Sequence, residues 1–353
     1  MTEVQVSIDG IVLYCDESIS NISLGNGYSI TKQKLDELPY KTRVVDGNGN
    51  LSINYLGSRM NDNGAVSFMC LHKADTHQIT FQTAPGMIIT DRDTMCEDQL
   101  SAYKDREMDY LHKMFSLLRL FKAGNIGCKE IFFVHKFTVM GFINNTQTQT
   151  NDSVTRNIVD NRVYSLDADE IADCNNFIQK YAGKEYDLLN DCIQEFIWGL
   201  EQTDIPTGFE QFTTALEMLF LKKNQPNKKQ ALSKRVAVLL GKTPTEVTSL
   251  YKKMMNFYRY RSESLHEGNG KNITAAELIE LEDITRKSLQ EFMSICNHRV
   301  HQKQNVTWQE IKAGEISDLR NQVGLAIKAG TLPEGNDTLI EKIKAWFKNM
   351  FKK

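Results

Sequence analysis

The sequence lacks a long hydrophobic run and a signal peptide. No run of about 18 apolar residues occurs in the 353-residue chain, so no membrane-spanning helix is expected. Residues 1–10, MTEVQVSIDG, have neither the basic flank nor the apolar core of a signal peptide. These absences predict a cytoplasmic protein that does not contact a membrane.

A regular cysteine pattern is also missing. The seven cysteines are widely spaced and contain no C-x-x-C pair. This spacing favours buried thiols in a reducing compartment over a disulfide framework or a zinc site. Cys296, His298 and His301 are three potential ligands at a helix end with no fourth nearby, so structural roles are favoured there. The sequence predicts neither a metal nor a cofactor.

Composition excludes collagen-like, mucin-like and wholly disordered chains. About 41% of the residues are hydrophobic and 25% are charged, as in soluble globular proteins. The length is sufficient for two domains, each with its own buried core. The net charge of −3 shows that the chain as a whole is not a polycation.

The charge is nevertheless distributed unevenly. Residues 222–261 contain eleven Lys and Arg residues and one acid, Glu246, whereas residues 185–217 contain eight acids and no Lys or Arg. A basic segment can bind a polyanion, because phosphate neutralisation releases condensed counterions. Alternatively, these cations lie on solvated helix faces and balance the acidic helix that precedes them. Charge alone leaves both interpretations open.

The first part of the chain is predicted to be rich in β-strands. Alternating apolar residues occur in EVQVSIDGIVLYC, AVSFMCL, HQITFQT, GMIIT and EIFFVHKFTVMGFI. The sequence DGNG at 46–49 is a tight-turn signal, and apolar residues at helical spacing predict one long helix over 97–121. The polar residues 144–152 are predicted to form a loop or a strand. We therefore expect a β-rich N-terminal domain over residues 1–166.

From about Asp167 the pattern becomes helical. Four Thr-x-x-Glu capping boxes mark helix starts at Thr207, Thr243, Thr274 and Thr307. The predicted helices span 184–202, 208–223, 228–240, 244–266 and 275–297, with shorter ones after 307 and a basic amphipathic helix over 338–353. Short connections favour an antiparallel bundle over residues 167–353. The predicted fold class is α+β, with a β-rich domain first and an all-α bundle second.

One segment of the bundle carries residues suited to chemistry. NFYRYRSESLHEG contains Arg261, Ser262 and His266 in the pattern R-S-x-x-x-H. Together with FEQFTTALEMLF, ALSKRVAVLLG and ELIELEDITRKSLQEF, it resembles the successive helices of an Apea-like HEPN domain. The resemblance covers residues 183–297, about a third of the chain, with a C-terminal helical extension beyond it. Glu267 is a departure, because a glycine usually follows the histidine.

The resemblance implies metal-independent endonucleolytic cleavage of RNA by a homodimer that brings two copies of the motif together. RNA supplies its own nucleophile, the ribose 2′-hydroxyl, so the protein needs a proton-transfer group and a cation. Histidine side chains in general titrate near neutral pH, so His266 is suited to act as general acid or base. Arg261 can pair with the scissile phosphate through its planar fork, and Ser262 can orient the histidine or contact a phosphate.

The helical spacing leaves the geometry of the motif open. Arg261 and His266 are about 140° apart on an ideal helix, whereas residues 259, 262 and 266 form one stripe. Either the last turn unwinds before Gly268 or the pocket is assembled from two chains. Further RNA-binding candidates come from the basic tract: Arg259, Lys252, Lys253 and Lys234.

Three further residues are predicted to support the site. Glu217 and Arg235 occupy family-like positions in earlier helices, where we expect them to pair inside the bundle. Glu267 would add a carboxylate beside the motif.

The predicted function is that of a toxin or antiviral-defence ribonuclease. The N-terminal domain would then sense a regulatory protein or a phage-derived trigger, or restrain the nuclease. The alternative is a HEPN-like module without catalysis that dimerises or binds RNA or another ligand.

Overall fold

The computed structural model describes two compact units. The first (unit 1) comprises Met1–Glu185 and Ile197–Gly208, and the second (unit 2) comprises Tyr186–Phe196 and Phe209–Lys353. The residues described are 2–52, 55–62, 64–79, 89–139, 142–151, 162–182, 187–202, 204–221, 226–267 and 273–301. Unit 1 contains an antiparallel sheet and unit 2 contains a set of helices, which confirms the α+β class.

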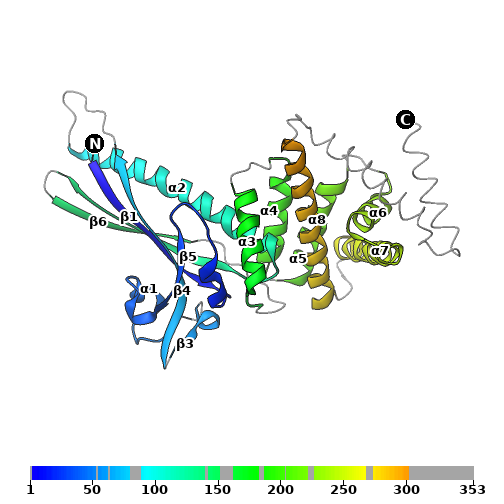
Figure 1. The fold of residues 1–353 in the computed structure, drawn as a ribbon, viewed down its shortest axis with the longest axis horizontal. Coiled ribbons are helices and arrows are strands. Elements are labelled where there is room, and N and C mark those ends of the chain that lie inside the picture. The colour runs from blue at the N-terminus through cyan, green and yellow to red at the C-terminus, as the bar shows by residue number, and fades with distance from the viewer. Residues whose placement is uncertain are drawn as a thin grey trace. The chain divides into compact units, whose positions relative to one another are not determined.

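The sheet of unit 1 is antiparallel throughout. Its path is β2-β4-β1-β5-β6, and β3 also pairs with β4 (Figure 1). The strands are β1 (Thr2–Leu13), β2 (Ser29–Lys34), β3 (Met60–Asp62), β4 (Ala65–Ile79), β5 (Gly127–Val139) and β6 (Phe142–Asn151). The polar segment that was predicted as a loop or a strand is therefore part of strand β6.

Helix α2 (Ile89–Phe121) covers one face of this sheet (Figure 1). Alternate residues of β1, namely Val4, Val6 and Ile8, are buried on that face, as the period of two in a strand requires. Helix α2 begins at Ile89 rather than at Glu97, so the end of the predicted strand GMIIT is helical. The acidic residues that follow Ile89 favour a helix start there, because they complement the helix dipole.

A buried ion pair fixes α2 to β4. Lys73 Nζ donates to Glu107 Oε1 at 2.8 Å, and both side chains are largely buried. The Tyr28 hydroxyl donates to Glu107 Oε2 at 2.7 Å, and the rings of Tyr28 and Tyr103 lie 5.2 and 5.7 Å from Lys73 Nζ. A buried charge with these partners is compensated, and loss of Lys73 would remove the cation that is paired with Glu107.

The opposite face of the sheet is covered at one end by the segment between β2 and β3. This segment contains η2 (Leu35–Glu37), α1 (Lys41–Val44) and η3 (Leu56–Ser58). Its residues complete an apolar cluster that consists of Ile11, Leu13, Leu38, Tyr40, Val44, Tyr55, Phe68, Cys70 and Phe132. The predicted DGNG turn is present, because Asp46 accepts hydrogen bonds from the backbone of Asn48 and Asn50.

The boundary between the two units lies later in the chain than predicted. The sequence predicted it at 166/167, but α3 (Ala168–Tyr181) belongs to unit 1. Asn175 of α3 accepts a hydrogen bond from the backbone of Ser23 at 2.8 Å and donates to the Asn21 carbonyl, next to η1 (Glu17–Asn21). A change from strands to helices in the sequence therefore did not coincide with the boundary between compact units.

Five helices follow α3. They are α4 (Asp187–Glu201), α5 (Ile205–Phe220), α6 (Lys228–Leu240), α7 (Pro244–Glu267) and α8 (Ala275–His301). The capping box at Thr274 is present, since Thr274 Oγ1 accepts from the Glu277 N–H at 3.3 Å and Glu277 accepts from the Thr274 N–H at 2.9 Å. The predicted box at Thr207 is wrong, because α5 starts earlier and Asp204 accepts from the Thr207 N–H at 2.8 Å.

Aromatic side chains form the core of unit 2. Phe209 of α5 meets Phe257 of α7 edge to face at 5.5 Å, and Phe220 meets Phe292 of α8 at 5.2 Å. Met254 is also fully buried. Edge-to-face pairs of this kind hold α5, α7 and α8 together.

Several sequence predictions lie outside the described residues. These are the helices after residue 307, with the Thr307 cap and the amphipathic helix over 338–353. Within the described part of the chain, every helix is too short or too polar to serve as a membrane span. The five cysteines whose side chains are described are buried free thiols, as predicted.

Candidate functional site: the exposed face of helix α7

The motif segment belongs to a single unbroken helix. Helix α7 runs from Pro244 to Glu267, so it includes the backbone of Arg261, Ser262 and His266. Of the two alternatives left open by the spacing, unwinding of the last turn before residue 268 is therefore contradicted. Thr243 Oγ1 accepts from the Glu246 N–H at 3.3 Å, so the predicted cap at Thr243 is present, and Glu246 accepts from the Lys242 N–H at 2.7 Å.

Arg261 is bound within unit 2. Its Nη1 donates to Glu217 Oε1 of α5 at 2.7 Å, and the two side chains are only 18% and 16% exposed. The guanidinium carbon lies 6.0 Å from the centre of the Tyr258 ring, and Nε is buried without a hydrogen-bond partner among the described residues. Burial, with the nearby Glu217 carboxylate, raises the pKa of the Tyr258 hydroxyl to about 12.

The partners of Glu217 and Arg235 differ from the prediction. The two residues were expected to pair with each other, but Glu217 binds Arg261. Arg235 of α6 donates from Nη1 to the Phe220 carbonyl, the last carbonyl of α5. A cation at this position satisfies a terminal carbonyl and complements the helix dipole.

The solvent-facing side of α7 is polar. Apart from Glu246 in the first turn, the exposed residues among the described side chains of α7 recur at intervals of three or four and are Thr245, Ser249, Lys252, Asn256, Arg259 and Ser262. We call these six residues the outer stripe. Arg259 is 47% exposed, and its Nε lies 3.6 Å from Glu263 Oε1, four residues along the same helix. Both Arg259 and Ser262, predicted as site residues, are thus accessible to a ligand.

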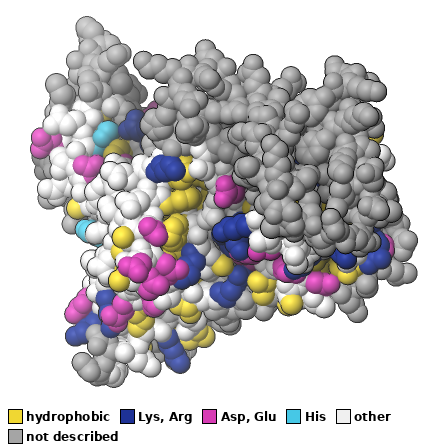
Figure 2. Space-filling model, turned by 45° about the vertical axis from the view of Figure 1, so that its right-hand side comes forward, with side chains coloured by type: hydrophobic (Ala, Val, Ile, Leu, Met, Phe, Trp, Pro, Cys, Tyr) yellow, Lys and Arg dark blue, Asp and Glu magenta, His cyan; other side chains and the backbone are white. Residues whose placement is uncertain are grey.

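The rest of the basic tract contains exposed and paired cations. Lys252 is exposed, whereas Lys253 pairs with Glu280 of α8. Lys234 is partly buried. Figure 2 shows described cations and acids interspersed on the face in view. Of the tract's ion pairs, Arg261–Glu217 joins it to the preceding acidic stretch, as the alternative interpretation stated, whereas Lys253 pairs with the later helix α8.

Two predicted site residues are described by their backbone alone. His266 and Glu267 lie within α7, and their side chains lie outside the described residues. Position 266 follows Arg259 by seven residues and Ser262 by four. On an unbroken helix these three positions share one face.

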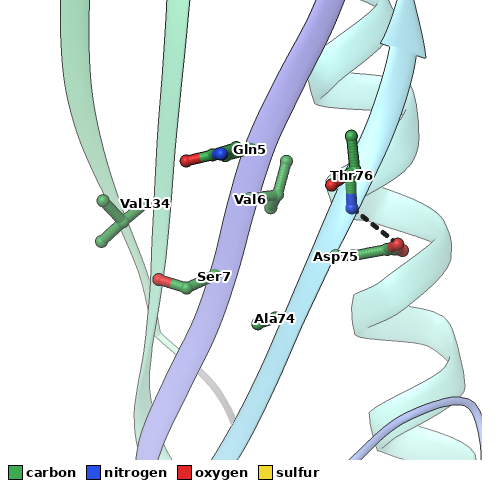
Figure 3. A pocket seen from close by; sticks show the side chains of 7 residues that line it. All are labelled: Gln5, Val6, Ser7, Ala74, Asp75, Thr76 and Val134. Atoms are coloured by element: carbon green, nitrogen blue, oxygen red, sulfur yellow. Dashed lines mark hydrogen bonds between the residues drawn. The ribbon is translucent and has the colours of Figure 1, made fainter.

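Unit 1 contains a separate groove. It has a volume of about 610 Å³ and is lined by Gln5, Val6, Ser7, Ala74, Asp75, Thr76 and Val134 (Figure 3). Two residues further along β1 and β4, Asp9 Oδ1 lies 2.7 Å from His72 Nδ1. The groove contains none of the residues that were predicted to act on RNA, and only Asp75 in its lining is charged.

Comparison of the chain with protein-family models, with curated proteins and with solved structures finds no match. The HEPN resemblance therefore rests on the motif and on the helices that surround it.

Sequence reasoning missed the Glu217–Arg261 pair, although it named both residues. A signal was available in the helical phase of Arg261. This residue follows buried Met254 by seven positions and buried Phe257 by four, so it continues the core stripe of α7. A charged residue in a core stripe requires a buried partner, and Glu217 on α5 is that partner.

Proposed function

We propose that this protein is a metal-independent endoribonuclease of the HEPN type that acts as a toxin or antiviral-defence effector. The observation that carries the proposal is the unbroken end of α7. It places the exposed residues Arg259 and Ser262 on the same helical face as position 266. In the resembled motif, His266 transfers the proton and Arg261 pairs with the phosphate.

The chemistry requires few groups. Proton abstraction from the 2′-hydroxyl makes it a nucleophile toward the adjacent phosphorus, and the 5′-oxygen of the next nucleotide leaves with a proton. The products are a 2′,3′-cyclic phosphate and a 5′-hydroxyl end. One imidazole with a pKa near neutrality and one guanidinium are suited to these steps.

The proposal includes a homodimer. Two copies of α7 would bring two motifs together, which removes the need for all groups to come from one helix face. Unit 1 would respond to a regulatory protein or a phage-derived trigger.

A second function is favoured by the Glu217–Arg261 pair. An arginine that is fixed to a carboxylate at 2.7 Å is already neutralised. This arrangement suits a non-catalytic HEPN-like module that binds RNA or dimerises. The exposed Arg259 and Lys252 would serve such a module equally well.

Expression in a bacterial host distinguishes the two functions. The nuclease predicts growth arrest with fragmented cellular RNA for the wild type, and relief of both by His266→Ala at equal protein level. Lys287→Ala, on the exposed side of α8, is the matched control and should arrest growth like the wild type. A harmless wild type that binds RNA would support the module and contradict the nuclease.

A further inference from the structure

The two arginines near the end of α7 lie on opposite sides of the helix. Arg259 belongs to the outer stripe and is 47% exposed, whereas Arg261 is 18% exposed. Two residues correspond to about 200° of helical rotation, so their side chains leave the helix in nearly opposite directions. Position 266 is about 20° from Arg259 and about 140° from Arg261 on the same unbroken helix.

Their bonding also differs. Arg261 continues the core stripe of Met254 and Phe257 and donates to Glu217 at 2.7 Å. For Arg261 to bind a phosphate, it would have to leave a largely buried carboxylate, and Glu217 would then keep the Tyr258 hydroxyl beside it but lose the cation that balances its charge. Among the described residues, Arg259 has an exposed contact of 3.6 Å with Glu263, and its guanidinium carbon lies 5.5 Å from the centre of the Tyr260 ring. Exposed ion pairs of this kind contribute little, so Arg259 can exchange Glu263 for a phosphate at small cost.

We infer that Arg259, rather than the motif arginine Arg261, is the guanidinium that contacts the RNA phosphate beside His266. Lys252, two turns earlier on the outer stripe, contacts a second phosphate. Arg261 is a positioning residue that joins α7 to α5 through Glu217. This inference rests on the proposed function, because it identifies how the same site holds RNA.

The salt dependence of binding tests the assignment. The probe is a 15-nucleotide 2′-O-methyl oligouridine, which has no free 2′-hydroxyl and stays intact. The full chain is titrated at several KCl concentrations, and log Kd is plotted against log salt concentration. Each phosphate contact to a single strand contributes about 0.7 to the magnitude of this slope.

The variants distinguish residues that contact the RNA from residues that join α7 to α5. Arg259→Ala and Lys252→Ala should each weaken binding and reduce the slope by about 0.7. Arg259→Lys should keep the slope, because the charge remains. The double variant Glu217→Gln with Arg261→Gln removes both charges of the buried pair and should keep the wild-type slope. Lys287→Ala, an exposed lysine on α8, is the control and should leave the slope unchanged.

Two failures are distinguishable. In the first, the wild type binds the oligonucleotide and only the Glu217/Arg261 double variant reduces the slope. Arg261 is then the phosphate contact, so the inference is overturned while the proposed function stands. If the wild type does not bind the oligonucleotide at all, the proposed function fails and the inference fails with it.

Discussion

Arg261 and Glu217 illustrate how a residue that looks functional in the sequence can also be part of the packing. The guanidinium lies at the end of a core stripe, and its partner comes from another helix. The pair therefore joins α5 to α7, and its stability can be measured independently of any activity.

Glu217→Ala should destabilise unit 2 by about 2 kcal/mol, because it leaves a largely buried guanidinium without its carboxylate. Urea unfolding followed by circular dichroism measures the change. Glu291→Ala, at an exposed glutamate of α8, should change the free energy of unfolding by less than about 0.5 kcal/mol. Equal effects of the two substitutions would show that the Glu217–Arg261 contact does not stabilise the bundle.

Two histidines make unit 1 sensitive to mild acid. Burial lowers the pKa of His135, and burial together with Arg106 lowers the pKa of His77. Their folded pKa values therefore lie below the ordinary value of about 6.5, so the unfolded chain binds protons more readily. The stability that the neutral rings contribute is fully present above the ordinary histidine pKa of about 6.5 and is lost as the pH falls below it.

Lowering the pH from about 7.5 to about 5.5 should thus reduce the urea midpoint of unit 1, and His135→Gln should make the midpoint less dependent on pH. The carboxylates of Asp16 and Asp75 have lowered pKa values and titrate below this window. A midpoint that rises on acidification would contradict the assignment of His135 as a neutral buried ring.

At the scale of elements, local signals predicted helices well where capping and apolar spacing agreed. The predicted helix over 228–240 is α6, and 244–266 differs from α7 by one residue. The start of α5 was wrong because Asp204 offered a cap earlier than Thr207. Whether the last turn of α7 stays helical could not be predicted from the motif, because the pattern R-S-x-x-x-H does not specify backbone geometry.

The cap of α8 gives an element-scale test. Thr274→Ala should cost about 1 kcal/mol, because the N–H of Glu277 loses its acceptor and the first turn of α8 loses a cap. Thr274→Ser retains the hydroxyl oxygen and should stay within a few tenths of the wild-type value. Thermal unfolding at constant pH measures both variants. Identical midpoints for Thr274→Ala and the wild type would contradict the role of Thr274 as the cap.

At the scale of the whole molecule, the α+β class followed from composition and periodicity, but the division into units did not. The sequence becomes helical from about Asp167, so α3 was placed in the second domain, yet Asn175 binds Asn21 of η1 and Ser23 in unit 1. Such long-range hydrogen bonds have no local signature. The candidate site was likewise predicted only in part. The motif identified the segment, but only the packing of α5 against α7 shows that Arg261 pairs with Glu217 while Arg259 is exposed.

The central claim is that the face of α7 that carries position 266 cleaves RNA without a metal ion. The most direct measurement is incubation of the full chain with RNA in excess EDTA, followed by analysis of the end groups. The wild type should produce 2′,3′-cyclic phosphate and 5′-hydroxyl ends, and His266→Ala should reduce the rate by at least about 100-fold. Cleavage that occurs only with added magnesium, or that is unchanged by His266→Ala, would contradict this account.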